Sequence, residues 1–257
     1  MSERDLEVLP FHSSIKRDKF DLFKSLTRSG LKFKDGDIIV VSSKFVSMSE
    51  GRVLKLSKIK VSNKAQILAA RFDMDPKIAE ITIRESDHIL GGIHGFLLAI
   101  RDGMIAPNAG IDKSNVPPGF IILYPNNAFE SAEHLRSRFL NNCKIRVGVV
   151  IADSRLMPTR IGTVGVAVGC AGFEPVEDER GKKDLFGNIL QVTRKAVADG
   201  LASVGVAVMG EANESTPAVV IRGFKVTLTD RKLSKDDMTI DPSQDIYIRS
   251  LGHRLDI

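Results

Sequence analysis

Apolar side chains recur every third or fourth position in several stretches of the chain, and this spacing predicts amphipathic helices. Near the N-terminus, Phe20, Phe23 and Leu26 are spaced in this way. Further along, Ser62 is a favoured N-cap, and Asp75 precedes a proline that suits a first helical position. The predicted helices cover residues 16–28, 62–72, 75–85, 127–140 and 190–203.

Short runs of β-branched and other apolar residues, bounded by turn residues, predict strands. The run 38–41 follows a Lys-Asp-Gly-Asp turn and has the composition of a buried strand. Asp102-Gly103 is a favoured two-residue turn, so the flanking residues predict a hairpin. The predicted strands cover residues 38–41, 96–100, 104–106, 120–124, 147–152, 204–208 and 218–221. Because hairpins interrupt the alternation of helices and strands, we predict an α+β fold and not a doubly wound sheet.

The length of 257 residues suits one large domain or two small ones. The sequence contains no internal repeat and no low-complexity linker. We therefore expect a single unit over residues 1–257, with a division into two subdomains left open. The residues 230–257 are polar and weakly patterned, and we expect them to form a C-terminal tail.

Composition excludes several broad classes of protein. Hydrophobic residues make up 43% of the chain and charged residues 27%, which excludes a wholly disordered protein. No apolar run approaches the roughly eighteen residues of a membrane-spanning helix, and the charged N-terminus lacks the apolar core of a secretory signal. The two cysteines, Cys143 and Cys170, are too few for a disulfide framework. We expect two reduced thiols in a cytoplasmic protein with no membrane partner.

The net charge is +5, from 37 basic and 32 acidic residues. This charge suits an anionic small ligand or a mild attraction to nucleic acid. Tryptophan is absent and only two tyrosines are present, so few aromatic side chains are available to stack on bases. The basic residues are spread along the chain, and we do not expect nucleic acid to be the partner.

Three polar segments are each predicted to follow a strand: residues 108–115, 153–154 and 209–216. They supply Asp112, Asp153, Ser154 and Glu211, whose oxygen atoms could converge on a hard cation such as Mg²⁺ or Mn²⁺. Such ions usually accompany a phosphate-bearing substrate. Asp, Asn, Gly and Ser are also common turn formers, so three ordinary turns are the alternative.

Other familiar catalytic signatures are missing from the sequence. The glycine-rich run 162–169 does not end in the Gly-Lys-Ser/Thr of a Walker A motif, and close packing against neighbouring elements is the favoured explanation. The five histidines lack metal-ligand spacing, and His134 is expected to be solvated on a helix. The basic turn 180–184 is either a solvated loop or a clamp for a phosphate or carboxylate.

The sequence resembles the coenzyme F420-0:γ-glutamyl ligase family from about Leu9 to Gly223. Each matching segment is weak alone, but their order and spacing together are specific. One of them is Asn-Ala-Gly-Ile-Asp-Lys-Ser-Asn at 108–115. The segments that carry the resemblance are 36–41, 47–52, 108–115, 147–154, 181–187, 197–199, 208–211 and 217–223.

The resemblance implies a GTP-dependent ligase that adds γ-linked L-glutamate to the deazaflavin coenzyme F420-0, and to F420-1, through an acyl phosphate. It implies two divalent metal sites for Mg²⁺ or Mn²⁺, assistance from K⁺, and a two-part α+β chain in an intertwined homodimer. No protein nucleophile is required. The implied ligands of the metal ions are Asp112 and Asp153 for one ion and Ser154 and Glu211 for the second.

The resemblance also implies a set of nucleotide contacts from four parts of the chain. Met48 stands where the family usually has lysine, so its contact with the nucleotide is expected to differ, and Lys44 is a candidate substitute. The implied GTP-binding residues are Leu9, Pro10, Phe11, His12, Ser43, Lys44, Met48, Asn115, Met209, Gly210, Glu211, Ala212, Asn213, Glu214, Ser215 and Thr216.

The loop that follows Ser154 also departs from the family pattern. Residues 155–159 replace the usual Gly-Arg, although Arg160 aligns with a common family arginine. The altered loop and Met48 each leave one alternative to the F420-0 ligase open. One is a related ligase or phosphotransferase with another acceptor acid, and the other is a protein that binds the nucleotide or deazaflavin without turnover.

Overall fold

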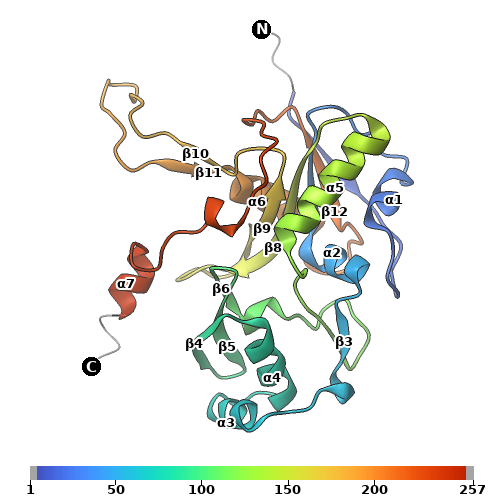
Figure 1. Ribbon diagram of the computed structural model, residues 1–257, viewed down its shortest axis with the longest axis vertical. Coiled ribbons are helices and arrows are strands. Elements are labelled where there is room, and N and C mark those ends of the chain that lie inside the picture. The colour runs from blue at the N-terminus through green and yellow to red at the C-terminus, as the bar shows by residue number, and fades with distance from the viewer. Residues whose placement is uncertain (1–4, 253–257) are drawn as a thin grey trace.

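The computed structural model describes residues 5–252 of the chain (Figure 1). Its strands are β1 (Glu7–Phe11), β2 (Ile38–Ser42), β3 (Val53–Lys55), β4 (His88–Ile93), β5 (Phe96–Arg101), β6 (Met104–Pro107), β7 (Phe120–Ile122), β8 (Gly148–Leu156), β9 (Thr163–Ala171), β10 (Val176–Asp178), β11 (Arg194–Ala196) and β12 (Ala218–Arg222). Its α-helices are α1 (Leu22–Thr27), α2 (Ser43–Glu50), α3 (Asn63–Arg71), α4 (Pro76–Glu85), α5 (Ala128–Cys143), α6 (Val197–Met209) and α7 (Ile246–Gly252). The 3₁₀ turns are η1 (Leu56–Lys58), η2 (Asn108–Gly110) and η3 (Lys235–Asp237).

A five-stranded sheet in the order β1-β12-β2-β8-β9 forms the centre of the larger part of the molecule. Only β2 and β8 run parallel, and the other neighbouring strands are antiparallel. Three smaller sheets of two or three strands complete the structure. This mixture of parallel and antiparallel pairing agrees with the α+β expectation, since a doubly wound sheet would be mainly parallel.

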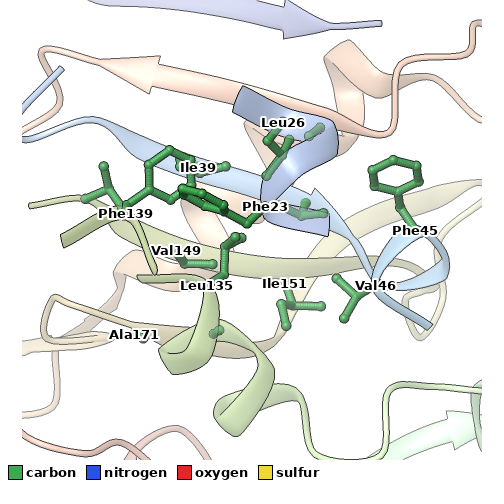
Figure 2. Packing of buried hydrophobic residues seen from close by; sticks show 14 of the residues in the cluster. Phe23, Leu26, Ile39, Phe45, Val46, Leu135, Phe139, Val149, Ile151 and Ala171 are labelled. Carbon is green, nitrogen blue, oxygen red and sulfur yellow. The ribbon is translucent and has the colours of Figure 1, made fainter. Parts of the chain in front are cut away.

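Helices cover both faces of the central sheet. The helices α1, α2 and α5 lie on one face, where Ile39, Val149 and Ile151 of the strands pack against Phe23 and Phe139 (Figure 2). Helix α6 covers the other face and contacts β2, β8, β9 and β12. The alternation of strand side chains between the two faces explains why β2 and β8 are continuous apolar runs.

Small residues let α6 and α5 approach the sheet closely. A Cβ atom at Gly165 in β9 would lie 2.4 Å from the Ala202 carbonyl oxygen of α6. One at Gly169 would lie 2.5 Å from the backbone of Ala128, at the start of α5. The glycine-rich run is therefore close packing of a strand against helices, as favoured from the sequence.

A smaller part, made of residues 53–122, is inserted between α2 and α5 and lies below the central sheet in Figure 1. It contains the β3–β7 pair, the β4-β5-β6 sheet and the helices α3 and α4. Its own apolar clusters include Ala65, Ala79 and Leu97 in one and Ile81 and Ile121 in the other.

Residues 176–196, here called the arm, leave the larger part as the β10–β11 pair with a long connecting loop (Figure 1). The basic turn 180–184 lies in this loop, and the neighbouring Leu185 and Phe186 are 100% and 92% exposed. Within residues 5–252, none of the helices is both long enough and apolar enough to cross a membrane. The cysteines Cys143 and Cys170 are both free thiols.

Several predicted elements are wrong in extent or type. The helix predicted over 16–28 begins only at Leu22, because Asp21 accepts a hydrogen bond from the Lys24 amide (2.9 Å) and caps it there. Residues 190–203 and 204–208 were predicted as a helix and a strand, but 197–209 form the single helix α6. The strand predicted to stop before Asp153 continues to Leu156 as β8, and the strand predicted over 120–124 ends at Ile122.

The polar tail contains η3 and α7 and otherwise little regular structure. Leu233 is buried and joins the cluster beneath α6, so the start of the tail packs on the larger part. Residues 253–257 of the predicted tail lie outside the described residues.

Asp37, just before β2, is a buried carboxylate that forms an ion pair with the partly exposed Arg222 of β12. Its side chain is 1% exposed and accepts hydrogen bonds from Arg222 Nε and Nη2, each at 2.8 Å. We expect Asp37→Asn to reduce the free energy of unfolding by about 3 kcal/mol, because the Arg222 guanidinium loses its buried carboxylate partner and keeps only the exposed Glu7 at 3.3 Å. Urea denaturation measures the change, with the exposed Asp236→Asn as control. Equal stability of the two variants would contradict the assignment.

Candidate functional site

A cavity of about 660 Å³ opens where the parallel strands β2 and β8 end. Ser42 closes β2, Asp153 and Ser154 belong to β8, and all three line the cavity. The carboxyl ends of neighbouring parallel strands are a common place for ligands in sheets of this kind. The remaining wall comes from α2, the segment 13–17, residues 115–117 and the loop 209–217.

A second cavity of about 230 Å³ adjoins the first on the side of the smaller part. Lys44, Asp153 and Ser154 line both cavities. The second cavity adds Ser43 and Asp112, together with residues of β5, β6 and the end of β8. The three polar segments singled out from the sequence are therefore brought together around two adjoining spaces.

Asp153 lies where the two cavities meet and lines both of them. One of its carboxylate oxygens accepts a hydrogen bond from Ser43 Oγ (3.0 Å), and the other accepts one from the Tyr124 hydroxyl. Burial raises the pKa of Asp153 above its ordinary value, although Tyr124, Arg155, Ser43 and Lys44 act in the opposite direction. A cation bound beside this carboxylate would offset its cost of burial.

Asp112 lies close to Lys44, whose Nζ is 2.6 Å from its carboxylate. The amide of Ser114 also donates to Asp112 at 2.7 Å. Burial raises the pKa of Asp112, but the bonds from Lys44 and Ser114 outweigh this effect and hold the pKa below its ordinary value. The Asp112 side chain is therefore an ionised carboxylate at the second cavity, and its oxygen atoms could bind a cation.

Ser154 and Glu211 face the larger cavity. Glu211 accepts a hydrogen bond from Thr163 Oγ1 (3.0 Å), so the loop after α6 is tied to the start of β9. The loop 209–216 follows a helix and not a strand, which corrects the position expected for it. Asn115 Nδ2 donates to the Ala212 carbonyl (3.2 Å), so two of the predicted nucleotide-binding segments meet across the cavity.

Some of the other predicted nucleotide contacts line the cavities, and others lie away from them. Lys44, Met48, Asn115 and all residues from Met209 to Thr216 line the larger cavity, whereas Ser43 lines the second one. Leu9, Pro10 and Phe11 belong to β1, and none of the three is in the wall of either of these two cavities. The Phe11 side chain is buried in the core, 6.1 Å from the Phe45 ring centre. His12 Nδ1 lies 2.9 Å from Thr216 Oγ1, behind the wall.

The four side chains predicted as metal ligands lie at the two cavities as two sparse sets of oxygen atoms. Asp112 and Asp153 line the second cavity, and Ser154 and Glu211 line the larger one. Within residues 5–252, no three His, Cys, Asp or Glu side chains form a group that would hold a metal ion by themselves. Mg²⁺ is commonly held by one or two carboxylates together with substrate phosphates and water, so such sparse sets suit it.

Sequence reasoning did not single out Tyr124, Lys16 or Arg17 as site residues. Lys16 and Arg17 line the larger cavity because residues 12–21 are an irregular segment and not the predicted start of a helix. Tyr124 lies two residues after the end of β7 and has no recognisable motif around it. Only its contact with Asp153, 29 positions away in the sequence, identifies it.

Tyr124 is held firmly in its position. Its hydroxyl accepts a hydrogen bond from Arg155 Nη2 (3.0 Å), and the guanidinium of Arg101 lies 5.5 Å from its ring centre. A Cβ at Gly110 would lie 2.3 Å from the ring, so the glycine leaves the space that the ring needs. Burial raises the pKa of Tyr124 above its usual range, and the hydroxyl stays protonated as a donor to Asp153.

We expect Tyr124→Phe to lower turnover in the reaction proposed below about tenfold, because a hydrogen bond to a charged group that orients Asp153 is lost. Kinetics at varied Mn²⁺ measure turnover and the metal concentration for half activation, which should rise. Tyr247→Phe, an exposed tyrosine on α7, is the matched control. Unchanged turnover and metal dependence in Tyr124→Phe would show that Tyr124 has no positioning role.

Comparison with known proteins identifies the family. A family model described as F420-0:γ-glutamyl ligase matches residues 19–223. The chain is 37% identical over 245 residues to the coenzyme F420:L-glutamate ligase of Methanopyrus kandleri, covering 94% of this chain and 96% of that protein. It is 40% identical to the enzymes of that name from Methanocaldococcus jannaschii (87% of this chain, 90% of that protein) and Methanothermobacter thermautotrophicus (79% and 81%). The chain therefore belongs to the F420-0:γ-glutamyl ligase family.

Proposed function

We propose that this protein is a GTP-dependent ligase that joins the amine of L-glutamate to the terminal carboxylate of coenzyme F420-0 and then of F420-1. The observation that carries the proposal is the meeting of two cavities at Asp153 and Ser154, lined by oxygen donors from distant segments. Relatives that carry the name coenzyme F420:L-glutamate ligase match most of the chain, which supports the same acceptor and amino acid.

The proposed reaction has two steps. First, a carboxylate oxygen of the acceptor attacks the γ-phosphorus of GTP, and the bond to the bridging oxygen breaks to release GDP. Next, the glutamate nitrogen attacks the acyl carbon of the acyl phosphate, inorganic phosphate leaves with the bonding pair, and the nitrogen gives up a proton. Lys16, Arg17 and Lys44 supply positive charge at the wall of the larger cavity, where the nucleotide phosphates are proposed to lie.

Two Mg²⁺ or Mn²⁺ ions form part of the proposal, with Asp112 and Asp153 as protein ligands of one and Ser154 and Glu211 of the other. K⁺ is proposed as an additional activator, as the family resemblance implies. When bound, the divalent ions neutralise the negative charge that builds up when phosphate and carboxylate oxygens are brought together. The chain itself orients Asp153 through Ser43 and Tyr124 and balances Asp112 with Lys44.

We also propose that the chain forms an intertwined homodimer through the arm. Leu185, Phe186 and Val192 are 100%, 92% and 86% exposed on an extension that projects from the larger part (Figure 1). Apolar side chains that gather on an exposed extension usually mark a protein interface. Sedimentation analysis of the full chain tests this point, and a monomer at micromolar concentration would contradict it.

The experiment that tests the function is an incubation of the purified protein with F420-0, L-glutamate, GTP and Mn²⁺, followed by product mass. A gain of one or two glutamyl units that requires GTP and metal is the expected result. GTP cleavage without a mass gain would instead identify a related ligase with another acceptor acid. No GTP cleavage in a folded, metal-loaded protein would identify a binding protein without turnover.

A further inference from the structure

The second cavity is placed to hold the group that receives the phosphate. Its wall shares Lys44, Asp153 and Ser154 with the larger cavity, so an occupant of one space lies directly beside an occupant of the other. If the nucleotide occupies the larger space, as proposed above, a carboxylate in the second cavity lies next to its terminal phosphate. Transfer between bound groups requires this kind of proximity.

The size of the second cavity limits what can enter it. Its volume of about 230 Å³ is roughly a third of the 660 Å³ of the larger cavity. It is also below the range of about 300–1,000 Å³ that holds whole drug-sized ligands. A deazaflavin coenzyme therefore fits only with the end of its side chain inside the cavity and its ring system outside.

A cation in the wall of this cavity is available for an anionic group. Arg155 lines the cavity, and its guanidinium donates to the Tyr124 hydroxyl at 3.0 Å. Among residues 5–252, no carboxylate lies within ion-pair distance of Arg155. An arginine at a cavity wall without a carboxylate partner suits a phosphate or carboxylate of a ligand.

An exposed apolar face begins at the mouth of the cavity. Phe96 of β5 and Leu156 of β8 both line the cavity, yet they are 47% and 56% exposed. Leu98 projects from the same face of β5 as Phe96, and Ile93 of β4 lies opposite Phe96 in the sheet. In Figure 1 the free end of the β8–β9 hairpin lies beside β6, so Leu156 and the β4-β5-β6 sheet border one opening.

We propose that the deazaflavin acceptor binds with its carboxylate end in the second cavity, near Arg155, and its flat ring system against Phe96 and Leu156. This inference rests on the proposed function and adds the acceptor subsite to it. The planar, apolar ring faces of a deazaflavin match an exposed aromatic side chain that continues from a charged cavity. Glutamate then approaches from the solvent side of the opening.

The test compares the full-length wild type with Phe96→Ala and with Ile67→Ala, a control on the exposed surface of α3. Steady-state ligation gives the KM of each substrate, and fluorescence titration gives the affinity for F420-0 without turnover. We expect Phe96→Ala to raise the KM for F420-0 about tenfold and to weaken the affinity for F420-0 by a similar factor. The reason is that aromatic contact and apolar burial are lost. The KM values of GTP and glutamate, the melting temperature and the oligomeric state should match those of Ile67→Ala.

Arg155→Met tests the charged end of the same subsite. We expect it to raise the KM for F420-0 and not that for glutamate, and Arg155→Lys should restore part of the affinity. A rise in the KM for glutamate alone would show that the cavity holds the amino acid and overturn the proposal. An unchanged KM for F420-0 in Phe96→Ala would also overturn the proposal. If Phe96→Ala changed only the oligomeric state, the apolar face would be an interface between copies of the chain, and the proposal would again be overturned.

Two different outcomes would separate the acceptor subsite from the proposed function. If the wild type adds glutamate to F420-0 but Phe96→Ala and Arg155→Met keep its KM unchanged, the function stands and the acceptor subsite is wrong. If the wild type neither ligates F420-0 nor binds it in the fluorescence titration, the proposed function fails and the subsite fails with it.

Discussion

Replacement of Asp153 by asparagine is expected to lower glutamate ligation by about 10²–10³-fold while the chain stays folded, which corresponds to roughly 3–4 kcal/mol of lost transition-state stabilisation. Asp153 lines both cavities and, unlike Asp112, has a pKa that burial raises above its ordinary value. Asparagine keeps an oxygen that can accept the bond from Ser43 but removes the negative charge. A hard divalent cation would lose one of its few anionic protein ligands.

Product mass and initial rates measure the loss in Asp153→Asn, and thermal denaturation checks the fold. The melting temperature should stay the same or rise slightly, because burial raises the pKa of this carboxylate and disfavours its charged form. Asp236→Asn, on the exposed turn η3, should keep full activity. Glu211→Gln should act in the same direction as Asp153→Asn but more mildly, because Glu211 is exposed at the rim. Near-normal ligation by Asp153→Asn would refute the metal assignment.

Phe139→Ala is expected to remove about 3–5 kcal/mol from the free energy of unfolding, the usual cost of truncating a buried phenylalanine. Phe139 lies on α5, is 0% exposed and packs against the central sheet (Figure 2). Its ring centre is 5.0 Å from that of Phe23 and 4.8 Å from that of Phe33. The truncation would leave a cavity where α1, α5 and the sheet meet, and these rigid neighbours cannot fill it.

Urea denaturation of Phe139→Ala gives the change in midpoint at constant slope. Ile67→Ala is the control, since Ile67 is 67% exposed and its loss should change stability by less than about 0.5 kcal/mol. If the urea midpoint of Phe139→Ala were close to that of Ile67→Ala, Phe139 of α5 would not be part of the buried core.

Local signals in the sequence predicted the elements whose ends are set by neighbouring residues. Ser62 caps α3 by accepting from the Ala65 amide, and Asp75 caps α4 ahead of its proline. The Asp102-Gly103 turn joins β5 to β6, with both residues at positive φ (51° and 75°). Caps and tight turns depend on contacts within about four positions, so the sequence pattern contains the information needed to place them.

The wrong assignments arose where packing outweighs the local pattern. Residues 204–208 alternate valine with smaller residues and resemble a strand, but Leu201, Gly205 and Met209 form one buried stripe of α6. A Cβ at Gly205 would lie 2.5 Å from the Val40 side chain, so this position must be small for the helix to lie on the sheet. The close contact with β2 therefore stabilises a helix that strand propensity alone opposes.

The sequence by itself determined the family and predicted most helices and the strands β2, β5, β6, β8 and β12. It also supplied the residue types on which the proposed metal and phosphate chemistry rests. Only the tertiary structure decided which of these residues meet. Parallel pairing of β2 with β8 brings Ser43 to Asp153 across 110 positions, and the inserted smaller part brings Asp112 and Tyr124 to the same place. A hydrophobic pattern records which face of an element is buried but not which partner buries it. That choice depends on the combined packing of both faces of the sheet, and no single segment of the sequence contains it.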